Sequence, residues 1–174
     1  MELTGNIFFF DWEVSLMQNL QASLPKALIS IISPLSMLGE ELVLIAVLGF
    51  FYWCYDKQLG KMIGLNVFVS MTWNAMIKNI ALRRRPYFDN EGIDILRPVD
   101  ADADIYDIRA QGYSFPSGHS SNAITAYGSI ARGIRKKWMT VLAVLLPLLC
   151  GFSRVMVGAH YPTDVLCGWA LGLI

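Results

Sequence analysis

Long apolar stretches divided by short charged connections dominate the amino-acid pattern. Residues 59–82 and 138–157 each come close to the roughly 20 apolar residues with which a helix crosses a bilayer. Residues 42–55 form a shorter apolar run that ends in Tyr and Trp, which are typical of a membrane interface. Residues 118–134 are rich in Ser, Ala and Gly, which favours a helix packed inside a bundle. The pattern predicts an all-α fold, a multi-span transmembrane helical bundle.

The two ends of the chain depart from this pattern. Residues 8–38 are interrupted by acidic residues and prolines, so two short interfacial helices are expected there instead of one straight span. Residues 163–174 would make about 18 Å of helix, whereas the hydrocarbon core is roughly 30 Å thick. We therefore expect one domain over residues 1–174, in a natural protein that continues past the last helix.

Composition and charge agree with a membrane protein. Hydrophobic residues make up 55% of the chain and charged residues 16%, against about 25% charged residues in soluble domains. The 14 basic and 14 acidic side chains cancel, so no electrostatic field of one sign favours nucleic-acid binding. The partner expected from the apolar composition is the lipid bilayer. The acidic run at residues 100–107 lacks the Gly and Glu of a calcium-binding EF-hand loop and is read as a solvated loop.

Basic residues predict the orientation of the bundle. They gather in two short connections that lie on the same side, and the positive-inside rule places such connections in the cytoplasm. The long segment 83–117 and the turn 158–163 then share the extracytoplasmic face of the cell membrane. The basic residues of the two connections are Lys57, Lys61, Arg132, Arg135, Lys136 and Lys137.

Two cations stand near the end of the apolar run 59–82. Lys78 and Arg85 are seven residues apart, about two helical turns, and Pro86 should end the helix at Arg85. Both side chains could then reach one anion. The alternative is snorkelling to lipid headgroups, which is the role expected of Arg83 and Arg84.

A second element with chemical meaning precedes the helix expected at residues 118–134. Ser117 is a natural N-cap, and the amides of Gly118 and His119 would have no intrahelical acceptor. A helix N-terminus of this kind binds anions, although many helices begin this way for capping alone.

A third element surrounds His160. Pro162 suits the first helical position, so Asp164 would sit in the first turn, where its carboxylate can hydrogen-bond one imidazole nitrogen and leave the other free as nucleophile or base. Arg154 offers a planar fork for phosphate oxygens. A lone histidine is more often structural, but this chain has only two, and both fall on the predicted outer face.

Together the three elements resemble the signature of the type 2 phosphatidic acid phosphatase (PAP2) superfamily, which also contains the vanadium haloperoxidases. Residues 78–86 read Lys-x6-Arg-Pro, residues 116–119 read Pro-Ser-Gly-His, and residues 153–164 read Ser-Arg-x5-His-x3-Asp. All three parts match without substitution and in order. Members of the family commonly have three spans before the first part, whereas the apolar pattern here gives two.

The resemblance implies a membrane phosphatase that acts on a lipid phosphate or a polyprenyl pyrophosphate through a phosphohistidine, with no metal and no other cofactor. His160 would attack phosphorus, Asp164 would orient it, and His119 would protonate the leaving oxygen. The residues implied to bind the phosphoryl group are Lys78, Arg85, Ser117, Gly118 and Arg154. Three alternatives remain at this stage: a lipid phosphotransferase, a membrane protein that binds phosphate without catalysis and, more remotely, a haloperoxidase.

Overall fold

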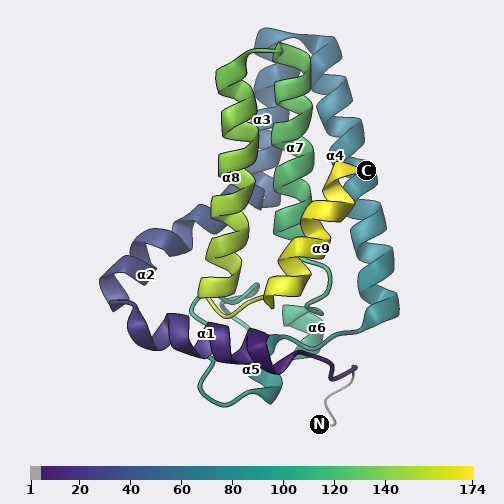
Figure 1. The fold of residues 1–174 in the computed structure, drawn as a ribbon. Coiled ribbons are helices and arrows are strands. Elements are labelled where there is room, and N and C mark those ends of the chain that lie inside the picture. The colour runs from purple at the N-terminus through teal and green to yellow at the C-terminus, as the bar shows by residue number, and fades with distance from the viewer. Residues whose placement is uncertain (1–4) are drawn as a thin grey trace.

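The computed structural model describes residues 5–174, which fold as a bundle of long helices with shorter helices across one end (Figure 1). The elements in chain order are α1 (Asp11–Ser23), α2 (Lys26–Ile32), the 3₁₀-helix η1 (Ser33–Gly39), α3 (Glu41–Phe50), the π-helical turn η2 (Phe51–Tyr55), α4 (Lys57–Ala81), α5 (Pro86–Asp89), α6 (Ile108–Gln111), α7 (Gly118–Ile134), α8 (Lys137–Met156) and α9 (Pro162–Leu173). Each expected apolar segment is a helix.

Helix α7 lies at the centre of the bundle, with α4, α8, α9 and η1 packed around it. Its small side chains, such as Ala123 and Ala126, are buried on several sides and let the neighbouring backbones approach closely. This confirms the interpretation of residues 118–134 as an inner helix. The main core cluster comprises Phe51, Leu59, Ile63, Ala123, Tyr127, Ile130, Met139 and Cys150.

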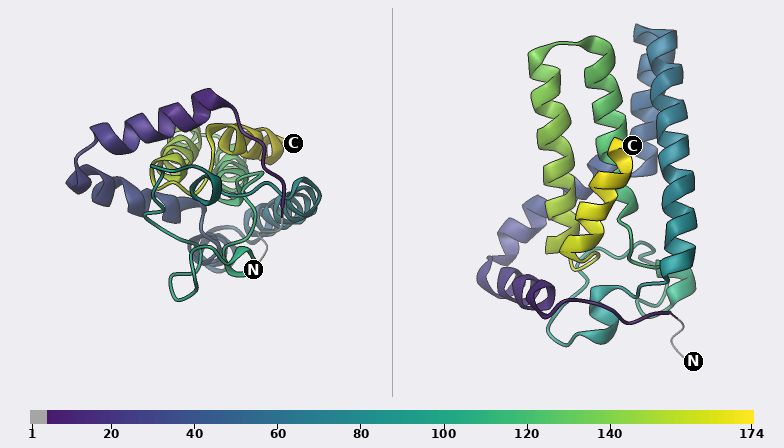
Figure 2. Two further views of the ribbon diagram at one scale, coloured as in Figure 1. Left: turned by 90° about the horizontal axis from the view of Figure 1, so that it is seen from below. Right: turned by 45° about the vertical axis from the view of Figure 1, so that its right-hand side comes forward.

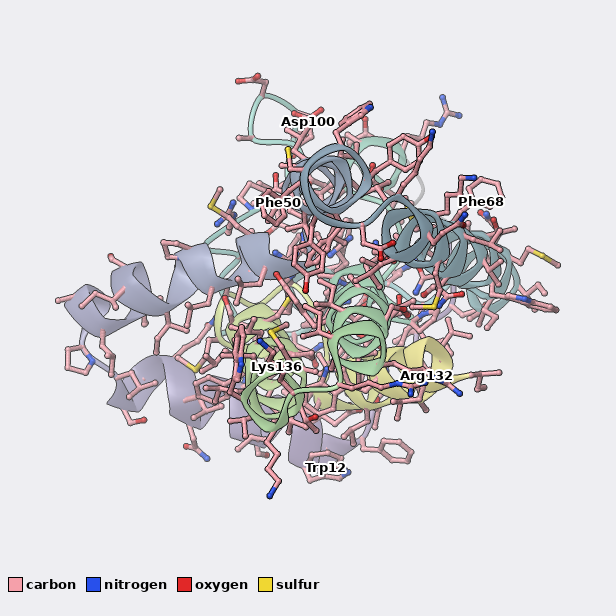
Figure 3. The ribbon with its side chains drawn as sticks, turned by 90° about the horizontal axis from the view of Figure 1, so that it is seen from above. Trp12, Phe50, Phe68, Asp100, Arg132 and Lys136 are labelled. Carbon is pink, nitrogen blue, oxygen red and sulfur yellow. The ribbon has the colours of Figure 1, made fainter. Side chains whose placement is uncertain are left out.

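The outer surface of the bundle is apolar where a bilayer would meet it. Phe68 on α4 is 68% exposed and points away from the bundle (Figure 3), whereas Asn74 on the same helix is buried against α7. Within residues 5–174, α8 is the one helix that is long and apolar enough for a straight span. The segments Asp11–Ser23 and Ala27–Gly39 meet the same criterion only as a pair bent by 110°. Helix α4 fails it because polar side chains face inward from its length.

The end of α4 differs from the prediction. The helix ends at Ala81, and Leu82 takes a left-handed conformation with φ of 51°, so Arg85 is not the last helical residue. The extended N-terminal segment causes this, because Asn6 donates from its side chain to Ala81 O (2.9 Å) and from its backbone to Leu82 O (2.7 Å). Residues 83–85 therefore run in an extended path, and Lys78 and Arg85 do not share a helix face.

The two ends of the bundle differ in structure: tight connections between long helices form one end, and short helices and long connections cover the other (Figure 2). Figure 3 looks onto the end formed by the α7–α8 connection, where Arg132 and Lys136 lie. At the opposite end α1 lies across the foot of α8 and hydrogen-bonds to residues 91–94 of the long connection (Figure 1). Helix α1 exposes Trp12 and buries Glu13 and Met17, so it lies flat with one face on the protein, as expected of an interfacial helix. All three sequence elements meet at this end.

Candidate active site

The start of α7 forms one wall of the site. The Ser117 hydroxyl accepts a hydrogen bond from Ser120 N (3.4 Å), and Ser117 N donates to Asp164 O (3.0 Å), which ties the beginnings of α7 and α9 together. Helix α4 closes the wall, since Asn74 Nδ2 donates to Pro116 O (3.4 Å). A Cβ at Gly118 would lie only 3.4 Å from the Asn74 side chain. The first turn of α7 is thereby fixed with its free amides at the site.

Three cations converge on this wall from separate elements. Lys78 comes from the last turn of α4, Arg85 from the extended segment and Arg154 from the last turn of α8, and they lie close enough for their charges to repel one another. Backbone carbonyls hold Arg85 in place, because its Nε donates to Gln111 O (3.0 Å) and Gly112 O (2.9 Å) and its Nη1 to Ala159 O (2.9 Å).

No carboxylate pairs directly with these cations. In the described part of the chain, none of the three lies within 4.0 Å of an Asp or Glu oxygen. Arg85 and Arg154 are buried, and the Nε of Arg154 has no hydrogen-bond partner among residues 5–174. Buried charge without a counter-charge is costly, so such a cluster is built to receive an anion.

His160 lies in the turn between α8 and α9, 2% exposed, beside the fully buried Asp164. Its Nδ1 is 3.6 Å from Asp164 Oδ2 and 3.5 Å from Ser114 Oγ. The first distance is longer than the direct hydrogen bond expected from the sequence. Asp164 Oδ2 instead accepts from Tyr161 N (2.8 Å) and from the Ser114 hydroxyl. Because Nδ1 faces these groups, Nε2 is left for a substrate.

The surroundings of His160 favour its neutral form. Burial lowers the pKa of His160 well below its usual value, and the positive charges of Arg85, Arg154 and Lys78 lower it further. The imidazole therefore carries a lone pair at neutral pH, as a nucleophile requires.

His119 occupies the first turn of α7, half-buried, where the positive charges of Arg154, Arg85 and Lys78 reach it. Its backbone oxygen accepts a weak hydrogen bond from Cys150 Sγ (3.8 Å). Helix η1 packs directly against the same carbonyl, because a Cβ at Gly39 would come within 2.2 Å of His119 O. His119 thus approaches the cation cluster from α7, and His160 from the α8–α9 turn.

The structure contradicts the roles expected of Arg83 and Arg84. Arg83 is 1% exposed and reaches Asp164 Oδ1 (2.6 Å) and Glu13 Oε2 (2.9 Å), so it faces the protein interior and not lipid headgroups. Arg84 pairs with Asp89 at 3.0 Å. Snorkelling was the wrong expectation because the helix ends at Ala81, which turns the side chain of residue 83 inward.

Sequence reasoning also missed Ser114, Glu13 and Thr163 as neighbours of the site. Ser114 lies just before the Pro-Ser-Gly-His element, but nothing in its local pattern marks a contact to Asp164. Glu13 gave the one available signal, since an acidic residue inside an apolar N-terminal segment needs a partner if it is buried.

Fold and site together define a helical membrane bundle in which a cluster of three cations lies beside two histidines. The family model described as "PAP2 superfamily" matches residues 58–174, and the chain belongs to this superfamily. The resemblance seen in the three sequence elements is thereby confirmed.

Relatives with assigned functions align with most of the chain. An undecaprenyl-diphosphatase of Sulfolobus acidocaldarius is 29% identical over 140 residues, which cover 79% of this chain and 62% of the relative. Phosphatidylglycerophosphatase B of Bacillus subtilis is 32% identical over 143 residues, which cover 76% of this chain and 63% of the relative. The chain thus spans less than two thirds of the length of these relatives.

Solved structures share the fold. The crystal structure of Aquifex aeolicus LpxE superposes with a TM-score of 0.80 at 23% identity, covering 94% of this chain and 92% of the other. That of the transmembrane PAP2-type phosphatidylglycerolphosphate phosphatase of Bacillus subtilis gives a TM-score of 0.71 at 26% identity, covering 93% and 79%. These similarities confirm the expected all-α, multi-span transmembrane bundle.

Proposed function

We propose that this chain is a membrane phosphatase that hydrolyses a lipid phosphomonoester or a polyprenyl pyrophosphate through a phosphohistidine. The observation that carries the proposal is the buried cluster of Lys78, Arg85 and Arg154, which has no carboxylate partner among residues 5–174 and stands beside His160. The names of the relatives support the substrate class, because they are phosphatases of undecaprenyl diphosphate, phosphatidylglycerophosphate and lipid A.

The cations and the start of α7 bind the phosphoryl group. Lys78, Arg85 and Arg154 hold its oxygens. Ser117 and the backbone amide of Gly118 complete the binding site for the phosphoryl group. Phosphoryl transfer depends above all on positioning and charge stabilisation, which these groups supply. No group of three His, Cys, Asp or Glu side chains in the described residues is arranged to hold a metal ion.

The two histidines divide the chemistry. Nε2 of His160 forms a bond to phosphorus while the bond from phosphorus to the leaving oxygen breaks, and His119 gives that oxygen a proton. Asp164 orients His160 and stabilises the positive charge that grows on its ring. In the second step water attacks phosphorus, His119 takes a proton from the water, and the phosphorus–nitrogen bond breaks to release inorganic phosphate.

We further infer that residues 1–174 form one domain whose site faces the extracytoplasmic side of the cell membrane. Support comes from the basic residues of the α3–α4 and α7–α8 connections, which lie at the end opposite to the site and favour the cytoplasm (Figure 3).

The test is phosphate release by purified protein from a panel of lipid phosphates and pyrophosphates, with and without chelator. Release of inorganic phosphate in proportion to lipid alcohol supports hydrolysis. A phosphorylated acceptor without free phosphate identifies a phosphotransferase, and vanadate binding without turnover identifies a non-catalytic binding protein. Either of the last two results overturns the proposal.

A further inference from the structure

Arg83 is the hub of a buried ion network that joins α1 to the α8–α9 turn. Its Nη1 donates to Asp164 Oδ1 (2.6 Å) and Thr163 Oγ1 (2.8 Å), its Nη2 to Glu13 Oε2 (2.9 Å), and its Nε to Phe8 O (2.8 Å). Side chains of Arg83, Glu13 and Asp164 are at most 2% exposed. Water therefore screens these interactions little.

Aromatic rings fix the plane of the guanidinium. Its central carbon lies 4.0 Å from the Tyr161 ring centroid and 4.8 Å from that of Phe8. With two aromatic rings against its central carbon and all three nitrogens hydrogen-bonded, the Arg83 guanidinium is held in one position. Such stacking and forked donation suit arginine and not lysine.

Glu13 anchors the far side of the network. Its Oε1 accepts from Thr163 N (3.0 Å) and Thr163 Oγ1 (2.6 Å), and its Oε2 from Phe10 N (3.0 Å) as well as from Arg83. One carboxylate thus holds the start of α1, the start of α9 and Arg83. Glu13 lies outside residues 58–174, the part of the chain that the superfamily model matches.

We propose that Arg83 is a positioning residue for the phosphatase reaction: it holds Asp164 Oδ1 so that Oδ2 faces His160, and Glu13 of α1 holds Arg83. The proposal rests on the proposed function, in which His160 is the nucleophile. Asp164 has three protein donors around its two oxygens: Tyr161 N and the Ser114 hydroxyl hold Oδ2 beside the imidazole, and the guanidinium holds Oδ1, so without Arg83 the carboxylate is anchored at one oxygen only. Groups that orient a catalytic ligand in this way are commonly worth 10- to 100-fold, roughly, when removed.

The charges of Arg83 and Glu13 should affect the pKa of His160 in a way that a purely structural role would not. His160 is surrounded by Asp164 and Ser114 from one side and by Lys78, Arg85 and Arg154 from the other. Removing the positive charge of Arg83 raises the pKa of His160, and removing the negative charge of Glu13 lowers it. Neutralising Arg83 and neutralising Glu13, the two members of one ion pair, should therefore shift the pKa of His160 in opposite directions.

The experiment measures the titration midpoint and the tautomer of His160 directly by NMR. The chain has two histidines, so ¹⁵N-histidine labelling gives two ring systems, and His119→Ala assigns them. In detergent-solubilised wild-type protein His160 should be the Nδ1–H tautomer. Arg83→Gln should raise its titration midpoint and mix the tautomers, whereas Glu13→Gln should lower the midpoint. Arg83→Lys keeps the charge but not the fork, so it should leave the midpoint nearly unchanged and still mix the tautomers.

Turnover of a lipid phosphate is measured on the same proteins. We expect Arg83→Gln to lower kcat by about 100-fold with KM changed by less than about threefold, because phosphate binding does not use this residue. Glu13→Gln should lower kcat by about 10-fold. Arg84→Gln is the matched control, since this neighbouring arginine pairs with Asp89 away from His160, and it should behave as wild type.

The outcomes separate the two proposals. Wild-type protein without phosphatase activity but with opposite midpoint shifts in the two variants contradicts the proposed function and leaves the positioning intact. An active wild type whose Arg83→Gln variant keeps kcat, the tautomer and the midpoint overturns the inference. If Arg83→Gln does not fold, Glu13→Gln decides: an unchanged midpoint and tautomer with lower thermal stability means a structural role only, which also overturns it.

Discussion

Asp164→Asn exchanges one oxygen for an amide nitrogen and should act through the hydrogen of His160. The guanidinium of Arg83 can only donate, so the new amide oxygen must stay at the Oδ1 position, 2.6 Å from Nη1. The amide nitrogen then occupies the Oδ2 position, 2.8 Å from Tyr161 N and 3.6 Å from His160 Nδ1. At Tyr161 N two donors would face each other in either tautomer, whereas at His160 Nδ1 they would do so unless the imidazole moves its hydrogen from Nδ1 to Nε2.

The change of tautomer sets the size of the effect. To accept from the amide, Nδ1 must lose its hydrogen, which places the hydrogen on Nε2, the nitrogen that attacks phosphorus. The same exchange in a Ser-His-Asp triad costs about 10⁴-fold for this reason. We expect kcat/KM to fall by about 10³- to 10⁴-fold, or about 4–5.5 kcal/mol of activation free energy. Arg83 keeps Glu13 as a partner, so the loss of folding stability should be only about 1.5–3 kcal/mol.

The assay combines three measurements. Turnover of a lipid phosphate gives kcat/KM, acid quenching followed by protein-bound ³²P counting gives the phosphoenzyme, and vanadate binding reports the intact pocket. Asp164→Asn should form phosphoenzyme slowly and bind vanadate nearly as wild type does, because the three cations are untouched. Asp102→Asn, in the exposed loop, is the control. A variant within about tenfold of wild type, or one that has lost vanadate binding, would refute the tautomer argument.

Four further outcomes are expected. His119→Ala should be far less impaired on a nitrophenyl phosphate than on an alkyl phosphate, because a good leaving group needs little protonation. His160→Ala should abolish turnover of both substrates. Equal impairment of His119→Ala on both substrates contradicts the assignment of His119 as the proton donor. The pH profile of kcat/KM should have its ascending limb below the ordinary histidine pKa of about 6.5, because burial and neighbouring cations lower the pKa of His160 and activity is lost as pH falls through that value. An ascending limb above pH 7 argues against a neutral, buried nucleophile. Activity should survive EDTA, and vanadate should inhibit competitively; loss on chelation that Mg²⁺ restores would show a metal requirement. In a variant without the native cysteines, an impermeant thiol reagent should label Asp102→Cys in intact cells but not Lys136→Cys, and the reverse pattern would invert the orientation.

The sequence predicted those parts of the site that local pattern controls. Lys78, His119 and His160 belong to short motifs whose residues are close along the chain, and Pro162 with Asp164 marks a helix start by its own chemistry. The long helices followed from apolar run length for the same reason, because a helix satisfies its hydrogen bonds within its own segment.

The parts that sequence reasoning missed depend on contacts between distant segments. Arg83 meets Glu13 across 70 positions and Asp164 across 81, and no local pattern records such a meeting. The early end of α4 has the same origin, because Asn6 binds its last carbonyls from 75 residues away. Ser114 was missed since a serine before a proline-rich turn reads as loop chemistry whatever it contacts.

Close packing at Gly39 couples the bent N-terminal arm, formed by α1, α2 and η1, to His119, the proton donor of the proposed reaction. The approach of η1 to His119 is backbone to backbone, where neither side can yield by changing a rotamer. A methyl group at residue 39 would meet the His119 carbonyl at 2.2 Å and push the first turn of α7 by about an ångström, a displacement that can cost an enzyme about a hundredfold in rate. Any tilt of the arm that a thicker or thinner bilayer imposes would be transmitted along the same contact to the proton donor.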